Sequence, residues 1–320
     1  MTALDSRVAA PADPAPDGAP PHGRRRPARH GRDNRTAYLM IAPMVVLLAV
    51  FVMWPLVYSL YLSTFKISFY TEPEFVGLDF YQYVLESPRF WESIWVGLYY
   101  AVLTVPTGIV IALLLASFIK TLSRRAASYM KTTVYLPAVV STVVASVLFV
   151  FMYQDDGVVN AMLGVLNHGP VNWLNDPSYA LPAIAVPGIW LSFGVTTLIL
   201  LAGLLDIPEN YYESAQLDGA GFFQRLFRIT IPLLKNVLLY LLVTGFTLAI
   251  QLFELPLIMT NGGPVDATMT PNLYIFASFR DLTPYATSFS LTASLMLFVV
   301  LGAISLVIFR LVNSDKAIDG

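Results

Sequence analysis

The sequence lacks cysteine, and its 320 residues contain only three histidines. Without cysteine, the chain cannot form a disulfide or use a thiolate as nucleophile or metal ligand. His22, His30 and His168 are too far apart in sequence to show the ligand spacing of a metal site. No glycine-rich phosphate loop ending in Gly-Lys-Ser/Thr is present, and no catalytic set of residues is visible. We therefore expect no metal, no cofactor in this chain and no enzyme activity of its own.

Charged residues are also scarce, at 12% of the chain compared with about 25% in an ordinary soluble domain. The mean hydropathy is +0.65, and the apolar residues gather in long runs without charge. A helix needs roughly 20 apolar residues to cross a bilayer, and helices satisfy their own backbone groups in lipid. Six runs separated by polar loops also argue against one large soluble core. The runs are Thr36–Phe65, Ser93–Ile119, Thr132–Gln154, Pro177–Leu205, Asn236–Phe253 (continuing to Thr260) and Leu282–Phe309.

The fold predicted from these runs is an all-α integral membrane protein with six transmembrane helices. Sixteen of the nineteen Lys and Arg residues lie in the two termini and in the loops after the second and fourth runs. The remaining three are Lys66, Arg89 and Arg280. The positive-inside rule then places both termini and the 206–235 loop in the cytoplasm.

The predicted organisation has five parts. Residues 1–36 form a disordered basic cytoplasmic tail, whose arginines contact anionic membrane lipid and which is not a cleavable signal. A first transmembrane helix (37–65), an external loop (66–92), a five-helix core (93–312) containing the loop 206–235, and a C-terminal tail (313–320) follow. We expect a short helix at Phe80–Glu86 in the external loop.

The 206–235 loop is polar but carries clear helix signals. Asp206 can cap a helix, Pro208 suits its first turn, and Glu209 fits a capping box. The predicted helix continues to about Leu217, where Asp218-Gly219 ends it. A second helix is expected from Phe222 to Ile229, with Pro232 marking entry to the fifth span.

One face of this predicted helix is suited to close contact. Tyr211, Ala215 and Gly219 recur at a spacing of four, and Glu213 and Asp218 lie near the turn, where a basic groove of a partner could meet them. A helix lying in a groove is a common recognition mode. The alternative is a surface loop that merely joins two spans.

The residues of this loop also resemble a known motif. Glu213-Ser214-Ala215, Asp218-Gly219-Ala220 and Ile231-Pro232 resemble the EAA motif of membrane subunits of bacterial ABC importers. In that family the loop is the coupling helix that docks into the ATP-hydrolysing subunit. This chain departs from the motif in having Ser214 in place of alanine and Lys235-Asn236 where a proline often follows.

Two further segments are similar to the carbohydrate branch of the family, the MalF-like permeases. They are Phe75-Val76-Gly77-Leu78, and Thr260-Asn261-Gly262-Gly263-Pro264 followed by Ala267-Thr268. Glycine and proline there also end the fifth span. The resemblance covers Tyr38 to Arg310 and implies the type I ABC importer permease fold in the bacterial cell membrane.

The resemblance further implies a set of partners and a function. Expected partners are a second homologous permease, two ATPase subunits that hold ATP and Mg, and an extracytoplasmic sugar-binding protein, with no nucleic acid. The implied function is import of a sugar driven by ATP hydrolysis on the partners. Monosaccharides, larger sugars and glycerol-phosphate-type substrates all stay open. The alternative, a stand-alone ion-coupled transporter, would need ionisable residues in the spans.

Glu254 is the only charge inside a predicted span, and such a carboxylate is costly in lipid. With Gln251 it is a candidate contact for sugar hydroxyls, or else a brace for the Gly262-Gly263-Pro264 loop. Aromatic faces that could stack on sugars are further candidates for the pathway, although aromatic residues in spans also pack or lie at the interface. These candidates are Trp190, Phe193, Tyr153 and Tyr240.

Overall fold

The computed structural model describes residues 30–68, 72–281, 283 and 285–313. Most of the predicted tail, residues 1–29, and residues 314–320 at the C-terminus lie outside this range. The chain divides into two units, residues 1–56 and 57–320. The first unit contains α1 (His30–Leu48) and the π-helical turn η1 (Ala49–Met53), and α2 (Trp54–Leu62) continues into the second. Residues 37–62 are apolar and long enough to cross a membrane.

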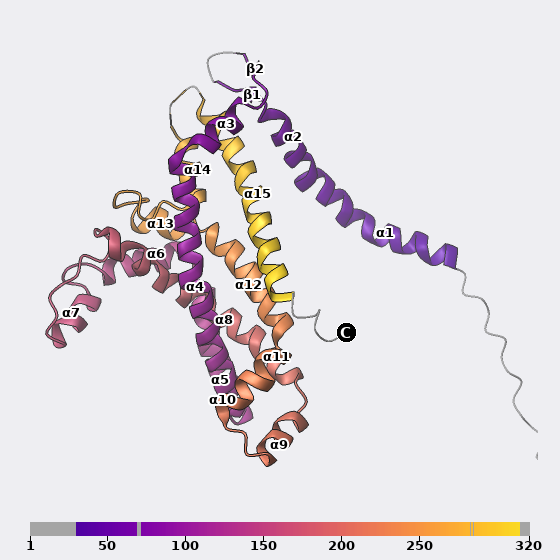
Figure 1. Cartoon of the computed structure of the whole chain (residues 1–320), viewed down its shortest axis with the longest axis vertical. Helices are drawn as coiled ribbons and strands as arrows, with labels where there is room; N and C mark the ends of the chain where they lie inside the picture. Colours follow the sequence, from indigo (N-terminus) through magenta and orange to yellow (C-terminus); the bar gives the residue numbers. More distant parts are fainter. Residues whose placement is uncertain (1–29, 69–71, 282, 284, 314–320) are drawn as a thin grey trace, which may run out of the picture. The chain divides into compact units, whose positions relative to one another are not determined.

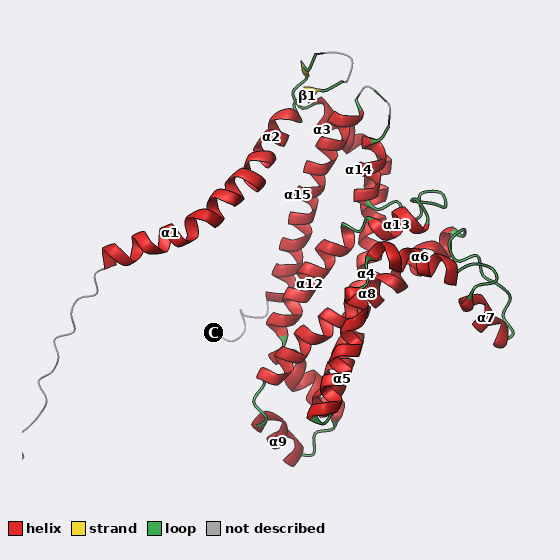
Figure 2. Ribbon diagram, turned by 180° about the vertical axis from the view of Figure 1, so that it is seen from behind, coloured by secondary structure: helices red, strands yellow, loops and turns green. Residues whose placement is uncertain are grey.

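The second unit is built almost entirely of helices (Figures 1 and 2). After α2, two short antiparallel strands, β1 (Phe65–Lys66) and β2 (Glu74–Phe75), form a hairpin. The helices and short helical turns that follow are α3 (Asp79–Glu86), α4 (Pro88–Thr121), α5 (Arg124–Tyr135), η2 (Leu136–Val139), α6 (Thr142–Met152), α7 (Val158–Val165), α8 (Pro177–Asp206), α9 (Asn210–Leu217), α10 (Phe222–Arg225), η3 (Leu226–Thr230), α11 (Ile231–Leu233), α12 (Lys235–Ile250), α13 (Glu254–Met259), α14 (Pro271–Phe279) and α15 (Ala286–Asn313).

The helix α4 is the centre of this unit and packs against both α8 and α12. Near the end that carries α9, it contributes Ala112, Ala116 and Ile119 to a buried cluster with α8 and α12. Near its other end, Phe90 and Ile94 pack with α15. Figure 1 shows α9 and the β1–β2 hairpin at opposite ends of this unit. The 34-residue α4 therefore runs between the two ends as one continuous element.

Five helical runs of the described chain are long and apolar enough to cross a membrane, and a bent pair supplies a sixth candidate. This agrees with six predicted spans, and α3 confirms the predicted short helix in the 66–92 loop. The third span, predicted for 132–154, is sharply broken rather than formed by one helix. Pro137 lies in the 3₁₀ turn η2, and Val140 is extended, so α6 restarts at an angle of 90° to the preceding helix.

The fifth span reaches Met259, close to the predicted end at Thr260, but it is interrupted within its length. Helix α12 ends at Ile250, and α13 begins at Glu254. Two carbonyls freed at the break are satisfied from the α14 region. Thr270 Oγ1 donates to the carbonyl of Leu252 at 2.5 Å, and Asn272 Nδ2 donates to the carbonyl of Gln251 at 2.8 Å. Satisfied carbonyls allow such a break inside an apolar environment.

Candidate functional site

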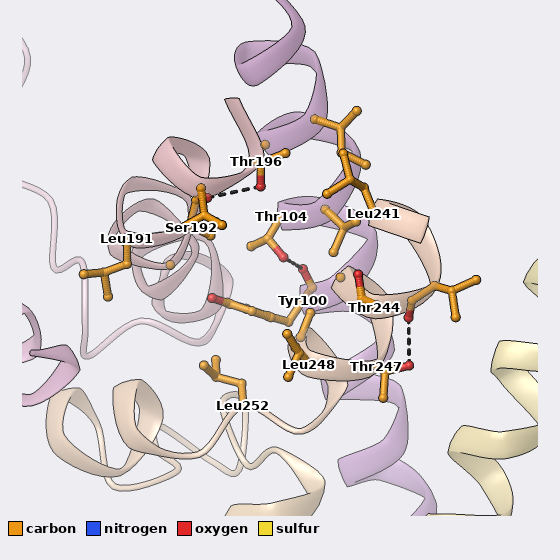
Figure 3. A pocket seen from close by; sticks show the side chains of 18 of the residues that line it. Tyr100, Thr104, Leu191, Ser192, Thr196, Leu241, Thr244, Thr247, Leu248 and Leu252 are labelled. Atoms are coloured by element: carbon orange, nitrogen blue, oxygen red, sulfur yellow. Dashed lines mark hydrogen bonds between the residues drawn. The ribbon is translucent and has the colours of Figure 1, made fainter. Parts of the chain in front are cut away.

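A cavity of about 750 Å³ lies between α4, α8 and α12. This is within the usual size range of small-molecule sites. Leucine, isoleucine and valine form much of the wall, and hydroxyl groups are distributed among them. Figure 3 shows these side chains around the cavity. The hydroxyl-bearing residues of the lining are Tyr100, Thr104, Thr142, Ser192, Thr196, Tyr240, Thr244 and Thr247.

Several threonine hydroxyls of the lining are already used as donors. Thr104, Thr196 and Thr244 each donate to the backbone carbonyl four residues earlier, at 2.8, 3.1 and 2.6 Å. A hydroxyl oxygen has two acceptor lone pairs in addition to its proton. The cavity wall therefore keeps acceptor capacity on several threonine oxygens, which suits a ligand that donates hydrogen bonds.

The phenol of Tyr100 enters the space beside Gly188. A side chain at Gly188 would collide with the Tyr100 hydroxyl, so glycine is what allows this ring to lie there. The ring is 3% exposed and extends across the cavity in Figure 3. No Asp, Glu, Lys, Arg or His lines the cavity in the part of the chain that the structure describes.

Of the six residues predicted for the pathway, only Tyr240 lines this cavity. Tyr153 is buried, donates to the Ala183 carbonyl at 3.0 Å, and packs on Trp173 and Phe149. Trp190 packs on the same Phe149, with ring centroids 5.9 Å apart.

The other three predicted residues also lie outside the lining. Phe193 is half-buried on α8. The Gln251 amide donates to the Thr247 carbonyl at 3.1 Å. Glu254 is exposed and starts α13, after the break within the fifth span, and no ion pair of its carboxylate occurs within the described residues.

The hydroxyl groups that line the cavity were not predicted from the sequence. Their signal was the pairing of hydroxyl residues four apart on three helices: Tyr100 with Thr104, Ser192 with Thr196, and Tyr240 with Thr244. Residues four apart share one helix face. Because threonine and serine interrupt an apolar run without charging it, these pairs are hidden inside the predicted spans.

The second site is the α9–α10 hairpin, residues 206–230. Asp206 does not cap it as predicted, because α8 continues through Asp206 and the N-cap of α9 is Glu209, without a side-chain cap bond. The end of α9 agrees with the prediction. Gly219 has φ +77°, its N–H bonds the Gln216 carbonyl, and the Ala220 N–H bonds the Ala215 carbonyl. This is a Schellman motif, in which glycine takes the left-handed position.

The outer surface of the hairpin is exposed and mixed in character. Among the predicted motif residues, Glu213, Ser214, Asp218, Gly219 and Pro232 are exposed, while Ala215, Ala220 and Ile231 are partly buried. Large apolar side chains lie beside them, with Leu217 90% exposed and Phe223 70% exposed. Exposed apolar groups gathered in this way mark an interaction surface.

The opposite end of the unit holds the predicted Gly262-Gly263-Pro264 segment. Gly262 is buried, with φ +87°, and α13 ends at Met259, before this segment. Thr268 Oγ1 donates to the Gly263 carbonyl at 2.8 Å and lies 2.6 Å from Thr260 Oγ1. These bonds fold the segment onto itself.

Comparison with known proteins places these features in a family. Residues 104–316 match the model of the binding-protein-dependent transport system inner membrane component. The chain belongs to this family. The permease fold predicted from the sequence is thereby confirmed, together with a multi-pass location in the membrane and a role as a transport component rather than an enzyme. The alternative of a stand-alone ion-coupled transporter receives no support.

Individual relatives agree with this assignment. The permease is 34% identical over 256 residues to the sulfoquinovosyl glycerol transport system permease protein SmoG of Agrobacterium fabrum, covering 78% of this chain and 83% of the relative. It is 32% identical over 283 residues to the trehalose/maltose transport system permease protein MalF of Thermococcus litoralis, covering 87% and 94%. The resemblance to MalF-like permeases is therefore confirmed.

A solved structure shows the same fold. A crystal structure of a bacterial ABC transporter involved in the import of the acidic polysaccharide alginate aligns with a TM-score of 0.74 and 25% identity. The alignment covers 90% of this chain and 98% of that chain. The helical arrangement around the cavity thus belongs to the type I ABC importer permease fold.

Proposed function

We propose that this permease imports a neutral sugar that an extracytoplasmic binding protein delivers. The observation that carries this proposal is the uncharged cavity lined by hydroxyl oxygens between α4, α8 and α12. Sugars present many hydroxyl donors, which match the free acceptor positions on the threonines, and apolar ring faces, which match the leucines. The permease named for trehalose/maltose supports this substrate class, because both of these sugars are uncharged.

The absence of charged residues from the cavity lining favours neutral over anionic sugars as substrates. A phosphate or carboxylate leaving water needs a positive partner, because the desolvation of an unpaired charge is costly. This half of the pathway supplies no such partner among the residues that line it. The glycerol-phosphate-type substrates left open by the sequence are therefore disfavoured.

The cavity is open on the side formed by α12. Tyr240 and Leu248 line it and are 56% and 71% exposed. We propose that a second homologous permease covers this open side and completes the pathway. The pairing is supported by the hydroxyl groups beside this open side, because lipid offers neither them nor a polar sugar a hydrogen-bond partner.

The α9–α10 hairpin is proposed to dock on one of two ATPase subunits, which carry ATP and Mg. Its exposed apolar and acidic groups support this role. The orientation follows from charge. Lys120, Arg225 and Arg228 lie at the end with α9, whereas Lys66 and Arg280 belong to the other end. The positive-inside rule therefore supports a cytoplasmic position for the hairpin. ATP-driven closure of the ATPases then moves the spans as rigid bodies.

Uptake by the complete transporter in proteoliposomes tests the substrate class. We expect uptake of a labelled neutral disaccharide to be inhibited by neutral sugars and not by sugar phosphates. Thr244→Val removes a lining hydroxyl without changing side-chain volume and should weaken apparent sugar affinity about three- to tenfold, since one net hydrogen bond is lost.

Thr133→Val provides the matched control, because Thr133 is exposed and donates only within its own helix, at 3.1 Å. Preferred uptake of an anionic sugar would overturn the neutral-sugar proposal. Equal apparent affinity in the Thr244 and Thr133 variants would remove this cavity from the pathway.

A further inference from the structure

Helix α9 is held on the rest of the permease by few side chains. None of its residues is buried, and its covalent links are the short segments before Asn210 and after Leu217. Tyr212 is the residue of α9 that packs on the buried cluster formed by α4, α8 and α12. Tyr212 is therefore a direct side-chain route by which movement of α9 reaches the spans.

Lys120 contacts Tyr212 from the end of α4. Its Nζ lies 4.3 Å from the centroid of the Tyr212 ring and 3.3 Å from Oε2 of Glu209. The Lys120 side chain is 22% exposed, so water screens this ammonium less than a surface charge. Lys120 also lies in the last turn of α4, where the helix dipole favours a cation. One ammonium thus binds both the start of α9 and its central ring.

The hydroxyl of Tyr212 makes the second connection. It lies 3.1 Å from Oγ1 of Thr230, which is buried and donates to the Arg225 carbonyl at 3.3 Å. Thr230 is the last residue of η3, just before the chain enters α11 and α12. The single side chain of Tyr212 therefore joins α9 to α4 through its ring and to the start of the fifth span through its hydroxyl.

We propose that Lys120, Glu209, Tyr212 and Thr230 form a strut that carries movement of α9 to α4 and hence to the cavity. The proposal rests on the proposed function of the hairpin as the ATPase-docking element. Helix α4 is unbroken from Pro88 to Thr121 and places Tyr100 and Thr104 in the cavity wall. At 1.5 Å per residue, Tyr100 lies about 30 Å along the helix from Lys120. A displacement at Lys120 would shift that wall without any change in the docking surface.

Lys120→Met tests the strut because it keeps the aliphatic stem and removes the ammonium. The transporter is purified with its ATPase subunits, reconstituted with binding protein and sugar, and assayed for ATPase retention and for sugar imported per ATP hydrolysed. We expect unchanged retention and a drop of about tenfold in sugar per ATP, within the usual range of coupling between sites. Lys120→Arg, which keeps the cation, should restore most of the ratio.

Two further variants keep the test decisive. Tyr212→Phe retains the ring and loses the bond to Thr230, so the ratio should fall by a smaller factor, about threefold. Lys131→Met is the matched control, since Lys131 lies on α5 at the same end of the unit and forms no ion pair within the described residues. It should leave the ratio unchanged.

The outcomes separate the two proposals. If the wild-type chain retains no ATPase, or if sugar and binding protein do not stimulate hydrolysis, the proposed function fails. If the wild type works and Lys120→Met imports as much sugar per ATP, the strut is wrong. If Lys120→Met loses ATPase retention together with transport, Lys120 supports docking rather than transmission, and the strut is also wrong.

Discussion

The two ends of the permease differ in how they treat their polar loops. At one end, residues 260–270 bury Thr268 and Thr270 and bond them to Gly263 and Leu252. At the other end, the α9–α10 hairpin is ordered by backbone turns and leaves Leu217 and Phe223 exposed. The first loop therefore satisfies its polar groups by its own packing, whereas the second leaves large apolar side chains in contact with solvent. Regular backbone structure alone thus does not remove the need for a partner, since the location of the apolar side chains also matters.

The largest expected effect comes from charging the exposed tip of the hairpin. Leu217→Asp should weaken ATPase retention by about 2 kcal/mol or more, as expected for an anchor in an interface, and leave the thermal stability of the free permease unchanged. Retention on immobilised ATPase at increasing dilution measures this effect.

Val265→Asp is the matched variant at the other end, where Val265 is 91% exposed with φ +49°. Aspartate tolerates this backbone region better than a β-branched residue, so no loss of stability or of ATPase retention is expected. Equal loss of ATPase retention in the Leu217 and Val265 variants would contradict the proposal that only the end with α9 binds the ATPase.

A smaller effect is expected from the buried loop. Thr268→Val removes a fully buried hydroxyl with two hydrogen-bond partners and should destabilise the permease by about 1–3 kcal/mol, the usual cost of unsatisfied buried groups. The thermal midpoint of the purified permease in detergent should fall, whereas ATPase retention below that midpoint should not. An unchanged midpoint would show that this loop contributes little to its own end.

The smallest effect is expected at Gly219. No heavy atom lies within 4 Å of an added Cβ, but φ is +77°. Gly219→Ala should therefore act through backbone strain alone, costing about 1 kcal/mol and weakening ATPase retention about fivefold. Gly219→Asn should cost less, because asparagine adopts the left-handed region more readily. A larger loss for asparagine than for alanine would point to a contact of the partner at this position.

Local signals allowed much of the fold to be predicted from the sequence. The uncharged runs located the spans, and Asp218-Gly219 located the end of α9, because both depend on residues close in the chain. Proline inside the third span indicates a kink, but the 90° size of the break after Pro137 was not predicted, since the sequence does not show how far a proline bends a span. The break before Glu254 depends on Thr270 and Asn272, which lie about twenty residues later.

The sites were less predictable because their residues come from distant parts of the chain. The residues of the predicted docking motif lie within one segment, 213–232, so they could be named in advance, and their role in binding an ATPase stays a prediction. Lys120 and Glu209 are 89 positions apart, and nothing in either segment indicates their ion pair. Aromatic residues were favoured for the pathway because of their chemistry, yet Tyr153 and Trp190 form a packed cluster with Phe149. Threonine and serine residues line the cavity together with Tyr100 and Tyr240.

The space beside Gly188 has a consequence for how such a pathway changes over time. One added methyl group there would displace the phenol of Tyr100 from its niche. A single substitution on α8 would therefore reposition a side chain of α4 and reshape the cavity without adding or removing a hydroxyl group. Substrate preference in a lineage could thus drift at a residue that offers the sugar no functional group.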